Sequence, residues 1–201
     1  MYEISKDIDA LIFDFDGTLV DSMPSHLLSW QAAFGAYGQT FTEQFFYEHA
    51  GVSLTGVVEA FNRAMGTALS PAAVVAKKDS RHSAYLDKIR PIPTVMEIVR
   101  HCYGHLPMAV ATGNSRALTE PLMASLDLTK YFNTVIYGED VRDGKPDPEC
   151  FLKAAGALGV SPSRCEVFED GDPGILAARR AGMKVTDVRP WLKVQRKGAS
   201  L

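Results

Sequence analysis

Residues 10–19 read ALIFDFDGTL, and this stretch decides the fold of the chain. Its apolar run extends over positions 10–15, interrupted by Asp14, and then gives way to Asp16 and Gly17. Such a pattern predicts a buried β-strand that opens into a loop. Asp14 and Asp16 are two positions apart, a spacing that can turn both carboxylates to the same side. We therefore expect two carboxylates where the first strand of a sheet ends.

Beyond this strand the chain shows two different periodicities. Apolar residues first recur at helical spacing, over residues 24–37, 54–65 and 71–89. After Pro91 and Pro93, which punctuate the chain, short apolar runs alternate with helical stretches. The predicted strands are residues 108–111, 135–137, 166–168 and 184–188, and the predicted helices are residues 118–126, 149–158 and 175–181. Strands that alternate with helices of this length indicate βαβ units.

These periodicities predict an α/β fold: a Rossmann-like parallel sheet with helices on both faces, plus an inserted all-helical domain. The α/β core would combine residues 1–20 and 90–201. Residues 21–89 would form the helical insert, which we expect to act as a cap.

The composition is that of an ordinary globular protein, with 46% hydrophobic and 22% charged residues. A net charge of -3 with scattered Lys and Arg argues against binding to nucleic acid or to an anionic membrane. No apolar stretch reaches the roughly 18 residues of a membrane span, and the N-terminus is acidic where a signal peptide would be basic. Three irregularly spaced cysteines, Cys102, Cys150 and Cys165, suit neither a zinc site nor a disulfide framework. We expect a cytoplasmic, monomeric protein with no nucleic-acid or membrane partner.

Ligands of an open parallel sheet bind outside the carboxyl ends of its strands, so polar residues at these places are candidates for a site. The candidates are Asp14 and Asp16, then Thr112, Gly113 and Asn114, then Lys145, and finally Glu169 and Asp170. Three or four carboxylates in one crevice would repel one another unless a cation lay among them. Oxygen ligands select Mg²⁺ over softer metals. The acidic residues therefore predict a magnesium site.

A Mg²⁺ ion held by few carboxylates usually completes its shell with water and substrate phosphate, which indicates phosphoryl chemistry. Lys145 can neutralise a phosphate group, and the Thr112 hydroxyl can donate a hydrogen bond to its oxygens. An Asp carboxylate next to the metal can attack phosphorus in line and form an aspartyl-phosphate that water later hydrolyses. Asp16 can protonate the leaving alcohol and deprotonate the attacking water.

This set of residues, in this order, resembles the haloacid dehalogenase superfamily over essentially the whole chain. The four family motifs match residues 14–19, Thr112, Lys145 with Pro146, and Glu169 with Asp170. The helical insert directly after the first motif resembles the cap of the β-phosphoglucomutase-like branch. Asp21, Pro24, His26 and Trp30 are most similar to bacterial sugar phosphatases of that branch, notably those that act on fructose 1-phosphate.

The resemblance implies a phosphatase of small phosphorylated metabolites, in which Asp14 is the nucleophile and Asp16 the general acid and base. Thr112 and Lys145 are the other catalytic residues that it implies. Asp14, the backbone carbonyl of Asp16 and Asp170 would bind Mg²⁺, and Glu169 would support the metal shell. The implied substrate-binding residues are Gly17, Thr112, Gly113, Asn114, Lys145 and His26.

Departures from the family pattern bear on the alternatives. β-Phosphoglucomutases carry an arginine where this chain reads Leu54 after Gly51, Val52 and Ser53, which argues against the alternative of a phosphosugar mutase. Gly171 stands where many relatives have serine, so the backbone amide is kept and a hydroxyl is lost. A dehalogenase needs no acidic metal site, so the metal site that Asp16, Glu169 and Asp170 imply argues against that activity. A non-catalytic binding module is a further alternative, although every motif residue that the reaction needs is present.

Each candidate also has a purely structural interpretation. Alone, the Asp-x-Asp-Gly-Thr pattern is compatible with a turn that has capping aspartates. His26 on a helix is more often packed or exposed than catalytic, and Lys77, Lys78 and Arg81 are expected on a solvated helix face. The order of the four motifs along the chain favours the functional interpretation of the core residues.

Overall fold

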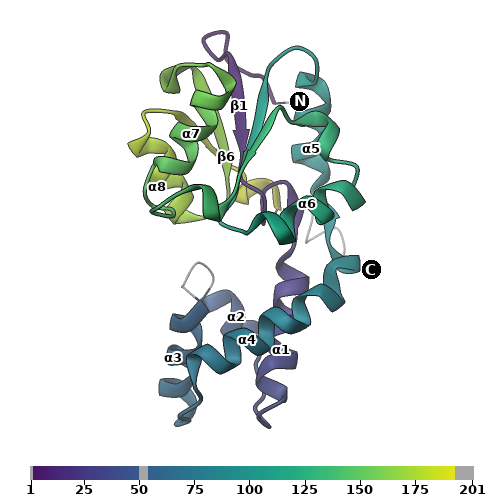
Figure 1. Ribbon diagram of the computed structural model, residues 1–201, viewed down its shortest axis with the longest axis vertical. Coiled ribbons are helices and arrows are strands. Elements are labelled where there is room, and N and C mark those ends of the chain that lie inside the picture. Colours follow the sequence, from purple (N-terminus) through teal and green to yellow (C-terminus); the bar gives the residue numbers. More distant parts are fainter. Residues whose placement is uncertain (1, 50–53, 193–201) are drawn as a thin grey trace. The chain divides into compact units, whose positions relative to one another are not determined.

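The computed structural model describes residues 2–49 and 54–192 of the chain (Figure 1). Contacts within the chain divide it into two compact units. The first, called here the α/β unit, comprises Met1–Asp21 and Arg90–Leu201. The second, called the helical unit, comprises Ser22–Ile89 and is therefore inserted in the sequence of the first.

A five-stranded parallel sheet forms the centre of the α/β unit, in the order β5-β4-β1-β6-β7. Its strands are β1 (Ala10–Phe13), β4 (Met108–Ala111), β5 (Thr134–Ile136), β6 (Cys165–Glu169) and β7 (Lys184–Asp187). Every residue of β1, β4 and β6 is buried, because central strands of a parallel sheet are covered on both faces. β1 pairs with β4 on one side and with β6 on the other, so the carboxyl ends of these three strands are neighbours.

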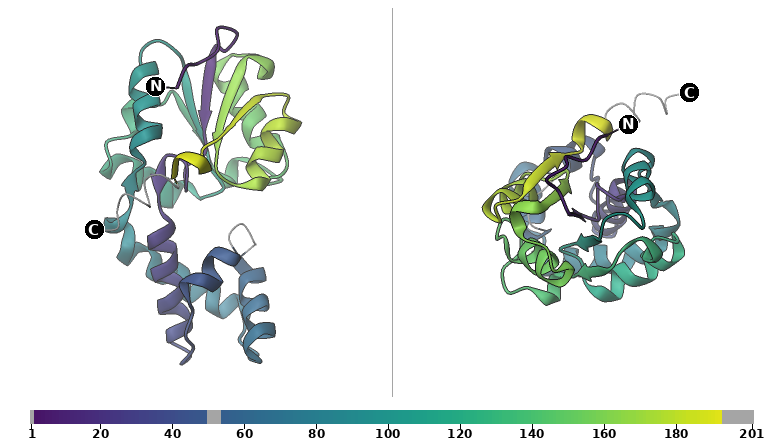
Figure 2. Two further views of the ribbon diagram at one scale, coloured as in Figure 1. Left: turned by 180° about the vertical axis from the view of Figure 1, so that it is seen from behind. Right: turned by 90° about the horizontal axis from the view of Figure 1, so that it is seen from above.

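Helices cover both faces of this sheet (Figures 1 and 2). α7 (Glu149–Leu158) and α8 (Asp172–Arg180) pack on one face, where their alanines meet aliphatic strand residues. α5 (Pro93–Cys102) and α6 (Arg116–Ser125) lie on the other face, as right-handed crossovers require. α7 is followed by Gly159 as its C-terminal cap, whose φ of +70° is a left-handed conformation that glycine adopts without strain. The predicted α/β fold is confirmed.

Some elements of the α/β unit are not visible in the sequence periodicity. Pro91 and Pro93 are expected only to punctuate the chain, whereas Pro93 opens α5 within its first turn, where the missing N–H removes no helical hydrogen bond. β2 (Val20–Asp21) and β3 (Arg90–Pro91) form an antiparallel pair that is too short to show an alternating pattern. The short 3-10 helices are η2 (Thr129–Tyr131), η3 (Gly138–Asp140) and η4 (Pro162–Arg164).

The helical unit has an aromatic core. It consists of α1 (Met23–Gly35), α2 (Glu43–Glu48), α3 (Leu54–Met65), α4 (Pro71–His82) and the 3-10 helix η1 (Ser83–Lys88). Phe34 and Phe41 stack with ring centres 4.8 Å apart, and Trp30 and Phe61 pack around them. Aromatic side chains bury large areas, so a small insert of this kind can hold a core of its own.

One expectation for the helical unit is wrong. Lys78 does not lie on a solvated face: it is 5% exposed, and its Nζ lies 5.7 Å from the ring centre of Trp30 and 3.4 Å from Asp79 Oδ1. The aliphatic stem of a lysine packs against apolar surface while the ammonium lies over an aromatic ring, and a charge pattern alone does not reveal this. Arg81 on the same helix is exposed, as expected.

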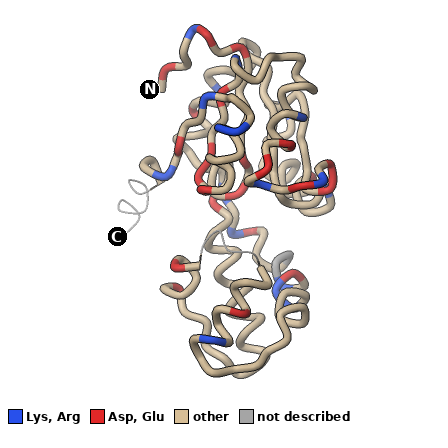
Figure 3. The backbone as a smooth tube through the Cα atoms, turned by 90° about the vertical axis from the view of Figure 1, so that its left-hand side faces the viewer, with Lys and Arg blue, Asp and Glu red and all other residues tan. Residues whose placement is uncertain are grey.

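Two further expectations concern the distribution of charge and the absence of a membrane-spanning segment. Lys and Arg are dispersed along both units and interspersed with Asp and Glu (Figure 3). Within the described ranges, no helix is both long and apolar enough to span a membrane.

Residues 51–53, on which the argument against a mutase partly rests, lie outside the described residues, and Leu54 begins α3.

Candidate active site

The candidate site lies where β1, β4 and β6 end. Asp14 directly follows β1, and its backbone N–H still donates to the Phe168 carbonyl of β6 at 3.0 Å. Thr112 directly follows β4. Glu169 is the last residue of β6, and Asp170 follows it. The sheet therefore brings these four predicted residues to one edge, the edge at which parallel sheets bind ligands.

Lys145, from the loop before α7, joins the two acidic strand ends. Its Nζ lies 2.5 Å from Asp14 Oδ1 and 2.9 Å from Glu169 Oε1, and it also donates to the Ala111 carbonyl at 3.2 Å. The side chains of Lys145, Asp14 and Glu169 are only 14%, 11% and 4% exposed. Burial disfavours the charge on Lys145, but attraction by Asp14 and Glu169 outweighs it and raises the pKa of this lysine. Lys145 is therefore a permanent positive charge.

The acidic groups outnumber this cation. One carboxylate oxygen from each of Asp14, Glu169 and Asp170 lies within 4.8 Å of the others. Burial raises the pKa of Asp14 well above its usual value, and the neighbouring carboxylates add to this although Lys145 opposes it. Burial and then Glu169 raise the pKa of Asp170 to about 6. Three converging carboxylate oxygens with surplus negative charge suit a hard cation such as Mg²⁺.

Two glycines make room for these carboxylates. Gly17 has a φ of +82°, and a Cβ at this position would lie 2.2 Å from Asp170 Oδ2. A Cβ on Gly174 would lie 1.7 Å from Glu169 Oε1. Thr18 Oγ1 donates to Asp170 Oδ1 at 3.0 Å, which fixes the orientation of that carboxylate. The carboxylates of Asp170 and Glu169 thus lie against the backbone of Gly17 and Gly174, where a side chain would not fit.

Asp16 and Asn114 form a second polar contact at this edge. The Asn114 side-chain amide donates to Asp16 Oδ2, and the Asn114 backbone N–H donates to Thr112 Oγ1 at 3.1 Å. Gly138, from the start of η3, donates its N–H to the Asn114 carbonyl at 2.9 Å. The first two motifs are therefore linked by a side-chain hydrogen bond, with the half-buried Asp16 as its acceptor.

The comparison with known proteins decides the family. The model of a hydrolase family, haloacid dehalogenase-like hydrolase, matches residues 8–182. The chain belongs to this family. It is 39% identical over 180 residues to fructose-1-phosphate phosphatase YqaB of Escherichia coli, covering 89% of this chain and 95% of the relative. It is 31% identical over 181 residues to a phosphorylated carbohydrates phosphatase of Thermotoga maritima, covering 88% and 83%.

A solved structure shows the same fold. A conserved haloacid dehalogenase-like protein from Agrobacterium tumefaciens matches with a TM-score of 0.79 at 27% identity, covering 90% of this chain and 82% of that chain. The family predicted from the four motifs is confirmed, and the protein is a haloacid dehalogenase-like hydrolase.

In this haloacid dehalogenase-like hydrolase, most of the predicted site residues come together. Those at the edge of the sheet are Asp14, Asp16, Gly17, Thr112, Asn114, Lys145, Glu169 and Asp170. Gly113 is exposed in the loop after β4, and His26 lies on α1 of the helical unit. A contact with substrate remains a prediction for these two residues, as it does for those at the edge of the sheet.

Some residues that shape the site are given no role by the sequence. Thr18 belongs to the first motif but reveals its hydrogen bond to Asp170 only in the structure. Gly138 carries no motif signal at all, because its importance lies in a backbone approach between two loops. Gly171 keeps the backbone amide that its position predicts, since its N–H donates to Glu169 Oε2 at 2.6 Å.

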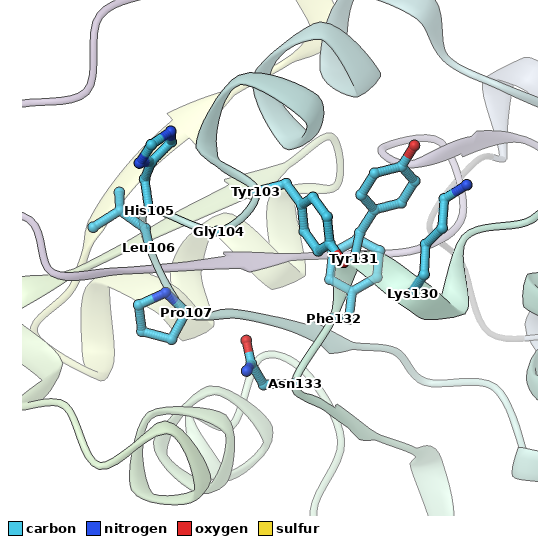
Figure 4. Close-up of a pocket in the computed structure, with 9 residues that line it drawn as sticks. All are labelled: Tyr103, Gly104, His105, Leu106, Pro107, Lys130, Tyr131, Phe132 and Asn133. Atoms are coloured by element: carbon cyan, nitrogen blue, oxygen red, sulfur yellow. The ribbon is translucent and has the colours of Figure 1, made fainter.

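A hollow of about 430 Å³ lies at the opposite edge of the sheet, where β4 and β5 begin (Figure 4). Residues 103–107 and 130–133 line it. The Asn133 side-chain oxygen accepts a hydrogen bond from the Met108 N–H at 2.9 Å, and Lys130 pairs with Asp127. The amide oxygen of Asn133 and the ammonium group of Lys130 are thus engaged within the protein. None of the motif residues lines the hollow.

Proposed function

We propose that this haloacid dehalogenase-like hydrolase is a magnesium-dependent phosphomonoesterase of small phosphorylated metabolites, sugar phosphates such as fructose 1-phosphate among them. The observation that supports it most is the buried contact of Asp14 with Lys145 inside a cluster of three carboxylates. The two relatives named above are phosphatases of fructose 1-phosphate and of phosphorylated carbohydrates. Their similarity supports the reaction class, while the substrate itself depends on residues that differ between relatives.

Asp14 is the nucleophile of the proposed reaction. A carboxylate oxygen of Asp14 attacks phosphorus, the bond between phosphorus and the substrate oxygen breaks, and an aspartyl-phosphate forms. Asp16 gives its proton to the departing alcohol oxygen. In the second step water attacks phosphorus, Asp16 takes a proton from it, and inorganic phosphate leaves as the Asp14 carboxylate is restored.

Phosphate binding depends on positive charge and donors at the sheet edge. Lys145 stays protonated, so it attracts the phosphate group toward Asp14 and stabilises the charge that develops during transfer. The Thr112 hydroxyl donates a hydrogen bond to a phosphate oxygen. Asp14, Asp170 and the Asp16 backbone carbonyl, supported by Glu169, would hold Mg²⁺, which supplies a further positive charge among the crowded carboxylates and phosphate oxygens.

The helical unit is the proposed cap of the site. It is inserted directly after β2 and returns to the α/β unit at β3, which pairs with β2. A cap at this point of the chain would follow the loop that carries Asp16 and Gly17. It would exclude bulk water from the aspartyl-phosphate and contribute residues such as His26 to substrate recognition.

Phosphate release from a panel of phosphorylated sugars, polyols and nucleotides tests this function. We expect release that needs Mg²⁺, stops with a chelator, and is concentrated on one or a few hexose phosphates. Asp14→Asn should abolish it. The matched control is Asp9→Asn, which makes the same exchange directly before β1, where Asp9 pairs with Arg164 on the surface, and should keep full turnover.

Other outcomes would overturn the proposal. Full turnover by Asp14→Asn would exclude the aspartyl-phosphate. Isomerised sugar phosphate with little free phosphate would identify a mutase of the β-phosphoglucomutase type. Absence of turnover on the whole panel, with Mg²⁺ binding intact, would identify a binding module that has lost the chemistry.

A further inference from the structure

The contact between Asn114 and Asp16 assigns a role that the motifs do not. The Asn114 side-chain N–H donates to Oδ2 of Asp16, so the residue expected to bind substrate is bonded to the proposed acid and base. Both residues are half-buried, at the ends of the neighbouring strands β1 and β4. A hydrogen bond to a carboxylate in such a place is stronger than one between neutral groups at the surface.

The backbone of Asn114 is held from two sides. Its N–H donates to Thr112 Oγ1 at 3.1 Å, and its carbonyl accepts from the Gly138 N–H at 2.9 Å. A Cβ on Gly138 would lie 2.4 Å from the Gly113 carbonyl oxygen, so the two loops can meet only because residue 138 is glycine. The backbone of Asn114 is therefore fixed, and its side chain has only two rotatable bonds. This is the arrangement expected of a residue that orients another group.

We propose that Asn114 is a positioning residue for Asp16, an inference that rests on the proposed phosphatase function. The donated hydrogen bond holds the plane of the Asp16 carboxyl and makes Oδ2 the carbonyl-like oxygen of its protonated form, so the proton is carried on Oδ1. As the bond from phosphorus to the substrate oxygen breaks, that proton moves from Oδ1 to the alcohol oxygen. The electron pair stays on the Asp16 carboxylate, which the Asn114 N–H then stabilises.

The dependence of the rate on the leaving group distinguishes this role from phosphate binding. An alkyl leaving group, as in a sugar phosphate, needs the proton from Asp16, whereas p-nitrophenolate departs without one. We expect Asn114→Ala to lower kcat/KM for the preferred sugar phosphate by about tenfold to a hundredfold, a part of what general acid catalysis supplies, and for p-nitrophenyl phosphate by no more than about threefold. The parameter kcat/KM is chosen because it reports the step in which the leaving group departs.

A second variant and a double mutant sharpen the test. Asn114→Leu keeps the shape of the side chain without its donor and should show the same difference between the two substrates. In an Asp16→Ala background, Asn114→Ala should have no further effect, because both changes then act on one group. Ser115→Ala is the matched control in the same loop, since the Ser115 side chain makes no capping hydrogen bond, and it should leave both rates unchanged.

Equal losses on both substrates would overturn the inference and make Asn114 a phosphate-binding or merely structural residue. A loss that persists in the Asp16→Ala background would overturn it as well. Failure of the proposed function is distinguishable, because Asp14→Asn would then still hydrolyse p-nitrophenyl phosphate.

Discussion

Two buried glutamates on β6, three positions apart, are used in opposite ways. Glu166 is 0% exposed and Glu169 is 3% exposed. Glu166 accepts hydrogen bonds from the Tyr2 hydroxyl and from Thr186 Oγ1, the latter at 2.6 Å, and its Oε2 lies 3.2 Å from Lys184 Nζ. One carboxylate is thus matched by one ammonium group and two hydroxyls, all within the fold.

At Glu169 the charges do not match. Glu169 and Asp14 share the ammonium group of Lys145, and Asp170 adds a third carboxylate close to both. A buried carboxylate with sufficient partners is a structural feature, and its burial alone says little about function. A cluster whose charge the protein leaves unmatched is a candidate functional site, and a bound cation would complete it. Charge balance, rather than burial, therefore distinguishes the two glutamates.

Removing Lys145 and Lys184 in turn should give the largest contrast between the groups of polar residues around Glu169 and around Glu166. Lys145→Met leaves the buried carboxylates of Asp14 and Glu169 without their ammonium partner, so we expect the free energy of unfolding without metal to fall by about 3 kcal/mol. We expect kcat/KM to fall by about a thousandfold, because the positive charge at the transferred phosphate is lost. Urea unfolding in chelator and in Mg²⁺, together with steady-state kinetics, measures both effects, and Mg²⁺ should restore part of the stability.

Lys184→Met is the matched control for this change. The Lys184 side chain is 41% exposed, so its pairing with Glu166 is screened by water, and its loss should lower the free energy of unfolding by less than about 1 kcal/mol. Activity should be unchanged. Equal destabilisation by the two substitutions would contradict the distinction drawn from charge balance.

Glu169→Gln should separate activity from stability. The amide removes one of the crowded negative charges but can accept a hydrogen bond from only one of Lys145 and the Gly171 N–H. These two effects oppose each other, so the unfolding free energy of the metal-free protein should change by less than about 1 kcal/mol. We expect the affinity for Mg²⁺ and kcat/KM to fall by about tenfold to a hundredfold, the usual effect of losing a group that supports a metal shell. Activity measured against Mg²⁺ concentration checks this. Unchanged activity with a destabilised fold would assign Glu169 to the structural class of Glu166.

The fold could be predicted where burial leaves a simple pattern. β1 and β4 are covered on both faces, and each is a continuous apolar run in the sequence. β6 is buried as well, but only its Val167 and Phe168 continue an apolar run between Glu166 and Glu169. α5 is missed because Pro91 and Pro93 suggest a break, although proline is favoured in the first turn of a helix. The pairing of β2 with β3 involves two residues per strand, which is too few for any period to show.

The site could be predicted in its parts but not in its connections. Parallel strands end at one edge, so the motifs after β1, β4 and β6 had to lie close together. The bond from Asn114 to Asp16, and the approach of Gly138 that supports it, depend on loop conformations that leave no periodic signal. Glu166, with no motif around it, gives no sign in the sequence that it is buried and satisfied.

Glu166→Gln should affect stability and leave the reaction intact. Gln can accept only through its carbonyl oxygen, so one of the groups that now donate to Glu166 loses its partner in the interior. We expect the free energy of unfolding to fall by about 1–3 kcal/mol, with kcat/KM unchanged. Tyr2→Phe, which removes one donor to Glu166, should cost about 1 kcal/mol. A fall in kcat/KM in either variant would show that the two clusters on β6 are coupled.

The smallest expected effect concerns Glu149, which holds the loop that carries Lys145. Glu149 Oε2 accepts from the backbone N–H groups of Arg142 at 2.8 Å and Asp143 at 3.2 Å, and its Oε1 lies 2.8 Å from Lys153 Nζ. Glu149→Ala should lower kcat/KM by about threefold, because Lys145 is then less well placed. Lys153→Met removes the ion pair, leaves the bonds to the loop, and should have no effect, which steady-state kinetics of the two variants can check.

The pH dependence of the same loop has a definite sign. Lys153, and then the two backbone N–H groups, lower the pKa of Glu149 to about 2. A carboxyl group with a lowered pKa stabilises the folded state above its ordinary pKa, and this contribution is lost as pH falls toward the lowered value. The stability difference between the wild-type protein and Glu149→Ala should therefore be constant near neutral pH and shrink as the pH falls from about 4 to 2. A difference that grows over this range would mean that the ionised form of Glu149 does not hold the loop, and the placement of Lys145 would then depend on its contacts with Asp14, Glu169 and the Ala111 carbonyl.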